Sequence, residues 1–192
     1  MQKNEIEIFY PPNLSAWRNW LEKNHQSKQA VWLVYYNKKS GIASISWSEA
    51  VDVALCFGWI DSKRISIDKE SSHQFFSKRK PKSTWSKINK DKVERLIEQG
   101  LMTEAGLLSI EIAKQNGSWI ILDEAENLTI PEDLENEFKD KPNAKDYFLS
   151  LSKSSRKVIL QWIVLAKTTE TRQKRITEVV ERAALKLKPK HL

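Results

Sequence analysis

Hydrophobic residues recur with strand spacing in four segments of the N-terminal part. Glu5–Phe9 alternates apolar and polar side chains, and Ala30–Tyr36 is a β-branched and aromatic run typical of a buried strand. Two further strands are predicted at Trp59–Ile67 and His73–Lys78, because a polar turn separates two runs of strand-forming residues. The pattern therefore predicts a small antiparallel sheet.

Helix signals lie between and after these strands. Ser46 and Glu49 stand three residues apart, the spacing of a capping box, and begin a predicted helix that ends at Gly58. Other helices of this part begin where a side chain can accept hydrogen bonds from the first helical turn. These positions are Asn13 or Ser15, Ser83 or Ser86, and Thr103.

The C-terminal part is predicted to be helical throughout. Pro131 occupies a first-turn position and precedes acidic residues, which suit the positive end of a helix dipole. Ser152 can cap one helix and Thr168 or Thr169 the last one, whose apolar residues form a single stripe. The predicted fold class is therefore α+β: a small antiparallel sheet with helices, followed by an all-helical part.

Charge is distributed unevenly, and this indicates how the chain is divided. The net charge is +7. Residues 119–138 hold seven acidic and no basic residues, whereas the segments on either side are basic. An acidic insert between basic parts indicates a boundary near Asp123–Thr129. We expect two domains, an α+β domain at 1–122 and a helical domain at 123–192.

Composition indicates a protein that folds in an aqueous compartment. With 40% hydrophobic residues and eight tryptophans, the 192-residue chain can bury a sizeable core. No apolar run approaches the roughly 20 residues that cross a bilayer, and Met1–Glu5 lacks the apolar stretch of a signal peptide. The single cysteine, Cys56, cannot support an intrachain disulfide framework. The expected localisation is cytoplasmic.

Motifs of the common cofactor and metal sites are missing from the sequence. No P-loop, G-x-G-x-x-G or G-x-S-x-G pattern occurs, and the five glycines are dispersed. His25, His73 and His191 match no metal-ligand spacing. Cys56 lies in an apolar helical segment, where a buried structural thiol is expected rather than a nucleophile. We expect no cofactor and no metal, and the sequence leaves enzymatic activity open.

The strongest candidate for a binding site is the basic segment that leads into the helix after Ser83 or Ser86. A helix N-terminus stabilises an anion through unpaired N–H groups and a partial positive charge. Arg79 can hold a carboxylate or phosphate with two parallel hydrogen bonds, and Trp85 can supply a flat wall. The predicted ligand-binding residues here are Arg79, Lys80, Ser83, Trp85 and Asn89. In the structural alternative, a serine caps the helix, Trp85 belongs to the core and the lysines are solvated.

A second candidate is the strand that begins at Trp59. Regular alternation would place Trp59, Asp61 and Lys63 on one face and Arg64 on the other. Asp61 could orient Arg79 or Lys63 through an ion pair, or act as a general base if it were desolvated. We therefore add Trp59, Asp61 and Lys63 to the predicted ligand-binding residues. A structural salt bridge is the alternative, since no nucleophile accompanies Asp61.

Three segments are specific enough to indicate a family. They are Ala50–Ser62, Arg79–Ser86 and Glu170–Ile176. All three resemble the YdeI/OmpD-associated family, also called the bacteriocin-protection family, and the resemblance extends over nearly the whole chain. The chain also resembles, more loosely, the YjbR/CyaY-like group of small α/β proteins, which agrees with the predicted order of helices and strands.

The resemblance implies a role in protection against bacteriocins or antimicrobial peptides, or in envelope stress. Combined with the basic segment at Arg79, it favours a protein that binds a small anionic ligand. Two other classes stay open. The basic excess would suit a nucleic-acid-binding module, although no recognition helix or stacking motif is evident. The acidic segment Asp123–Glu137 would suit an adaptor that binds a protein partner, including a second copy in a homodimer.

Overall fold

The chain forms two compact units, which we describe separately. The computed structural model describes residues 6–190, so Met1–Glu5 and His191 lie outside the described residues. The first unit comprises the chain up to Ser83 together with Ile88–Trp119. The second unit comprises Thr84–Lys87 and the chain from Ile120 on. The contacts thus divide the chain between residues 119 and 120, where charge alone placed the boundary at 122, and they assign residues 84–87 to the second unit.

The first unit is built on a four-stranded sheet with the strand order β1-β2-β4-β3. The strands are β1 (Ile8–Phe9), β2 (Ala30–Tyr36), β3 (Trp59–Ser66) and β4 (Ser71–Lys78). β2 and β3 each pair with β4 in the antiparallel direction, as predicted, whereas β1 runs parallel to β2. The sheet is therefore mixed, because α1 (Leu14–Asn24) returns the chain between β1 and β2 as a crossover helix.

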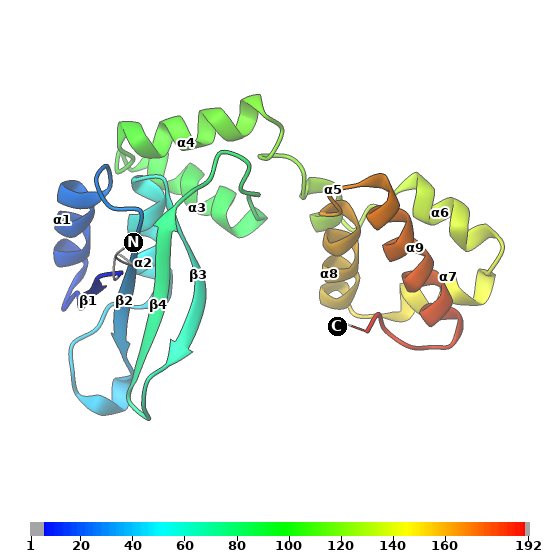
Figure 1. The fold of residues 1–192 in the computed structure, drawn as a ribbon, viewed down its shortest axis with the longest axis horizontal. Helices are drawn as coiled ribbons and strands as arrows, with labels where there is room; N and C mark the ends of the chain where they lie inside the picture. The colour runs from blue at the N-terminus through cyan, green and yellow to red at the C-terminus, as the bar shows by residue number, and fades with distance from the viewer. Residues whose placement is uncertain (1–5, 191–192) are drawn as a thin grey trace, which may run out of the picture. The chain divides into compact units, whose positions relative to one another are not determined.

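Helices cover one face of this sheet, and α2 (Trp47–Cys56) lies behind the strands in Figure 1. The buried face carries Val31, Leu33 and Phe76, which are fully inaccessible to solvent. Trp17 of α1 packs edge-on against Phe76 with 5.5 Å between ring centroids, and its indole N–H donates to the Ala50 carbonyl at 3.0 Å. Burying these large rings while satisfying the indole N–H joins both helices to the sheet.

Two longer helices complete the first unit, and the predicted caps at Asn13, Ser46 and Thr103 are confirmed. The two helices are α3 (Lys87–Glu98) and α4 (Glu104–Gln115). Ser46 and Glu49 form the predicted capping box of α2, and the Thr103 side chain caps α4. A short 3₁₀ helix, η1 (Lys38–Ser40), follows β2.

A β-bulge in β3 corrects the predicted alternation of side chains. Asp61 stands opposite Phe76, but Arg64 stands opposite Gln74, so two residues of β3 face the single residue Phe75. The extra residue reverses the alternation beyond Asp61. Arg64, rather than Lys63, therefore shares the helix-covered face with Asp61.

The contacts of the two basic residues agree with this register. Arg64 donates two hydrogen bonds to the Ser72 hydroxyl, at 3.0 and 2.7 Å. The Lys63 ammonium lies on the opposite face, 5.2 Å from the centroid of the Trp32 ring. The prediction that Lys63 and Asp61 lie on the same face of the sheet is wrong, because it assumed a strand without a bulge.

The second unit is helical in the part of the chain that the structure describes, which confirms the predicted α+β class for the chain as a whole. Its helices are α5 (Asp123–Glu126), α6 (Glu132–Lys139), α7 (Pro142–Ser150), α8 (Lys153–Val164) and α9 (Thr169–Ala184). Ser152 and Thr168 cap α8 and α9 as predicted. The core joins Leu134, Leu160 and Ile176, all fully buried, and the predicted apolar stripe of α9 faces it.

Candidate functional site

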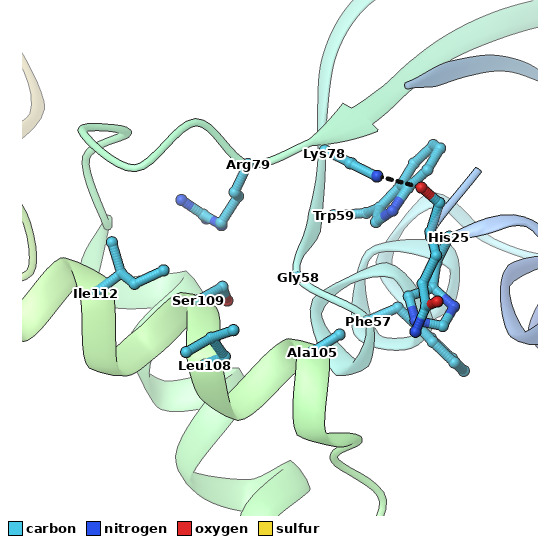
Figure 2. A pocket seen from close by; sticks show the side chains of 11 residues that line it. His25, Phe57, Gly58, Trp59, Lys78, Arg79, Ala105, Leu108, Ser109 and Ile112 are labelled. Carbon is cyan, nitrogen blue, oxygen red and sulfur yellow. Dashed lines mark hydrogen bonds between the residues drawn. The ribbon is translucent and has the colours of Figure 1, made fainter. Parts of the chain in front are cut away.

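A pocket in the first unit opens between the end of α2, the adjoining ends of β3 and β4, and one face of α4. Its volume is about 410 Å³. Figure 2 shows the side chains that line it. The residues that line it come from segments far apart in the sequence: His25, Gln26, Phe57, Gly58, Trp59, Lys78, Arg79, Ala105, Leu108, Ser109 and Ile112. All belong to the first unit, so the pocket does not depend on the second.

The backbone around Gly58 fixes one wall of the pocket. Gly58 has φ of +70° and stands between α2 and β3, where a left-handed residue turns the chain from helix to strand. A Cβ atom there would lie 2.9 Å from the Ala105 carbonyl oxygen, so only glycine allows α4 to pack this closely. The Gly58 carbonyl accepts the Arg79 backbone N–H at 2.9 Å. This bond places the Arg79 side chain beside the pocket.

Two cationic side chains lie at the end of β4. Burial lowers the pKa of Arg79 to about 10, while the nearby Asp61 carboxylate partly offsets this effect. The guanidinium thus remains charged at neutral pH, in surroundings that solvate it poorly. The Lys78 ammonium donates to the Gln26 carbonyl at 2.7 Å. No aspartate or glutamate is among the lining residues, so the pocket is electropositive.

Two of the lining residues, His25 and Trp59, have ring N–H groups. The Nδ1 atom of His25 lies 2.8 Å from the Leu21 carbonyl oxygen, and because a carbonyl only accepts, Nδ1 carries the hydrogen of this bond. Trp59 is fully buried, and its Nε1–H has no hydrogen-bond partner among the described residues. A buried donor without an acceptor is costly, so an acceptor bound beside Trp59 would remove a penalty.

The opposite wall is mainly apolar. Phe57 packs against the His25 ring with 5.2 Å between centroids. Leu108 and Ile112 project from α4 toward the pocket, and Leu108 is largely exposed (Figure 2). Ser109 uses its hydroxyl hydrogen to bond the Gly106 carbonyl at 2.7 Å. The pocket therefore offers cationic donors on one side and a hydrocarbon surface on the other.

Asp61 lies outside the pocket but within electrostatic reach of Arg79. One of its carboxylate oxygens accepts hydrogen bonds from the Trp47 indole at 2.8 Å and from the Gln74 amide at 3.2 Å. Burial, reinforced by the Asp61 charge, raises the pKa of Tyr35 far above its usual value. Asp61 thus belongs to a polar cluster on the helix-covered face of the sheet, where Trp47 and Gln74 donate hydrogen bonds to it. Its negative charge raises the pKa of Arg79.

The structure does not bring the other predicted residues into this pocket. Lys80 and Ser83 belong to one turn, in which the Lys80 backbone N–H donates to the Ser83 hydroxyl oxygen at 3.2 Å. Trp85 is buried and belongs to the second unit. Asn89 lies in the first turn of α3, and Lys63 lies on the far face of the sheet. Of the predicted ligand-binding residues, Trp59 and Arg79 line the pocket.

Sequence reasoning missed the contributions of α1 and α4. His25 and Ser109 carry no local signal, because only the tertiary packing brings them to Arg79. One sequence feature does point to α4. Gly106 interrupts a helical pattern, and such a glycine often marks close approach of a neighbouring backbone. A Cβ atom at Gly106 would lie 2.3 Å from the Cys56 carbonyl oxygen, which explains the glycine.

Neither a metal cluster nor a membrane span emerges from the described part of the chain. Between residues 6 and 190, no group of three or more His, Cys, Asp or Glu side chains is placed to hold a metal ion. In the same range, no helix is both long enough and apolar enough to cross a bilayer.

The fold combines a mixed-sheet α+β unit with a unit that is helical over its described residues. Residues 9–109, more than half of the chain, match the family described as a domain of unknown function (DUF8412), and the chain belongs to this family. Residues 127–186 match the family described as bacteriocin-protection, YdeI or OmpD-associated, which confirms the predicted family for the C-terminal part. The N-terminal segments on which that resemblance also rested, Ala50–Ser62 and Arg79–Ser86, lie within the first match. No curated protein and no solved structure matches the chain significantly.

Proposed function

We propose that the first unit binds a small organic anion, and that this binding serves the bacteriocin-protection role for which the C-terminal family is named. One observation carries the proposal: Lys78, Arg79 and Trp59 line one pocket whose lining side chains include no carboxylate. A pocket of about 410 Å³ lies within the range of small-molecule sites.

Each side of the pocket suits one part of such a ligand. Arg79 and Lys78 would hold a carboxylate or phosphate, because charge-assisted hydrogen bonds are stronger than neutral ones and Arg79 sits where water screens it little. The Trp59 N–H would donate to another oxygen. Leu108 and Ile112 would cover an apolar portion, so an amphipathic acid should bind more tightly than a bare inorganic anion.

Asp61 would act as a positioning residue rather than a ligand contact. Its charge raises the pKa of Arg79 against the effect of burial, and two hydrogen-bond donors hold it in place. Asp61→Asn removes a negative charge near a guanidinium that is charged at neutral pH, so anion binding should be unchanged or tighter, not weaker.

The test uses two neighbouring leucines of α4. Leu108 lines the pocket, Leu107 does not, and both are largely exposed, so Leu108→Glu and Leu107→Glu introduce the same charge at little cost to folding. Thermal-shift screening of the wild type against carboxylates and phosphates of increasing hydrocarbon content identifies a probe. Calorimetric titration then measures its affinity for all three proteins.

The expected result is a loss of about tenfold or more with Leu108→Glu, because a carboxylate at the mouth repels the anion, and little change with Leu107→Glu. Bacteria that express the three proteins are then challenged with a bacteriocin, and protection should follow affinity. The proposal fails if no anion raises the melting temperature, or if both leucine variants bind the probe equally.

A further inference from the structure

The face of the sheet opposite α1 and α2 carries aromatic side chains that are partly exposed, although Val34 on the same face is buried. In Figure 1 no helix of the first unit lies in front of β2, β4 and β3 over their described residues. Trp32 and Phe75 stand side by side on this face, with ring centroids 4.9 Å apart, and His73 lies 6.4 Å from Trp32. Ile65 is exposed on the same face. An antiparallel sheet usually presents polar side chains to water, so the partly exposed rings of Trp32 and Phe75 need a reason.

The charge of this face is positive. The bulge in β3 turns Lys63 toward it, and the ammonium lies 5.2 Å from the Trp32 centroid and 5.7 Å from the Phe75 centroid. Asp61 is the one acidic residue in the four strands as described, and it points to the helix-covered side. No carboxylate of the sheet therefore opposes an anionic partner on the open face.

We propose that this open face binds single-stranded nucleic acid. Every base has a flat π surface that stacks on an aromatic side chain, while a neighbouring lysine neutralises the phosphate. Trp32 and Phe75 supply the rings, and Lys63 supplies the charge. The Lys63 side chain is exposed, so its ammonium can leave the rings for a phosphate when a base arrives. This inference is independent of the anion pocket, which lies on other residues.

Fluorescence anisotropy tests this with fluorescein-labelled twelve-nucleotide oligothymidine, oligouridine and a duplex of equal length. The variants are Phe75→Thr and Lys63→Glu. Lys23→Glu is the control, because Lys23 is exposed on α1, which covers the opposite face, and the charge change is identical. Circular dichroism confirms that each variant is folded. Leu108→Glu is included to separate this site from the pocket.

We expect the wild type to bind both single strands and to bind less tightly as salt rises. A lost stacking contact costs roughly 5- to 150-fold in affinity, so Phe75→Thr and Lys63→Glu should each weaken binding about tenfold. Lys23→Glu and Leu108→Glu should stay within about threefold of wild type. Absence of binding, preference for the duplex, or equal loss in Lys63→Glu and Lys23→Glu would overturn the proposal.

Discussion

Gly106→Ala should destabilise the first unit, because α4 packs on the end of α2 with no room for a methyl group. The added Cβ would lie 2.3 Å from the Cys56 carbonyl oxygen, about 1 Å closer than ordinary contact. That oxygen already accepts the Thr103 backbone N–H at 3.1 Å and its hydroxyl at 2.6 Å. The oxygen cannot move away from the new methyl group without weakening its hydrogen bonds to Thr103, the residue that caps α4.

The expected cost follows from two opposing effects. Overpacking a close contact costs about 1–3 kcal/mol, and the upper end applies because the obstacle is backbone. Alanine stabilises a helix by up to about 1 kcal/mol relative to glycine, which offsets part of this cost. We therefore expect a net loss of about 2 kcal/mol. Gly100→Ala is the matched control: its φ is +66° but nothing lies within 4 Å, so only a left-handed backbone penalty of about 1 kcal/mol applies.

Urea denaturation followed by tryptophan fluorescence measures this difference. Six of the eight tryptophans belong to the first unit, so the signal reports mainly on its unfolding. Gly106→Ala should shift the midpoint to lower urea by more than Gly100→Ala does. An unchanged or raised midpoint for Gly106→Ala would show that α4 moves freely on α2, and the explanation for this glycine would be wrong.

Three further predictions concern single side chains. Ser46→Ala removes the capping box of α2 and should cost about 1 kcal/mol in urea denaturation; no loss would mean that the cap is redundant. Burial raises the pKa of the Cys56 thiol, so a thiol reagent at pH 8 should modify it only after urea unfolds the chain, and rapid reaction with the native protein would contradict this. Arg172 donates to both carboxylate oxygens of Asp133 at 2.5 and 2.9 Å and lowers its pKa. The ion pair therefore stabilises the second unit above the ordinary aspartate pKa of about 4 and is lost as pH falls through the lower folded value. Asp133→Asn should cost about 1 kcal/mol or less at pH 7, since both side chains are partly solvated, and it should flatten the fall in melting temperature below pH 4.

Much of the secondary structure could be predicted because its signals are local. The strand Ala30–Tyr36 has the predicted bounds, and Thr103, Ser152 and Thr168 cap the helices expected of them. A capping side chain bonds to a backbone group two or three residues away, so the sequence alone contains the whole interaction. The four-residue α5 was not predicted, because Leu122 before it offers no side-chain cap.

The candidate site depends on contacts that no local pattern contains. Arg79 was predicted from its basic neighbours, but its partners in the pocket include His25 and Ser109, which are distant in sequence. Arg79 and Trp85 are only six positions apart in the sequence, yet they are assigned to different units.

By itself, the sequence determined most of the segments that become helices and strands, and it indicated the family that residues 127–186 match. The tertiary structure decided which side chains meet. One extra residue in β3 sends Lys63 and Arg64 to opposite faces, and two glycines let α4 approach the end of α2 closely enough to form a pocket wall. Register and close packing are set by pairing between distant segments, so only the folded chain fixes them.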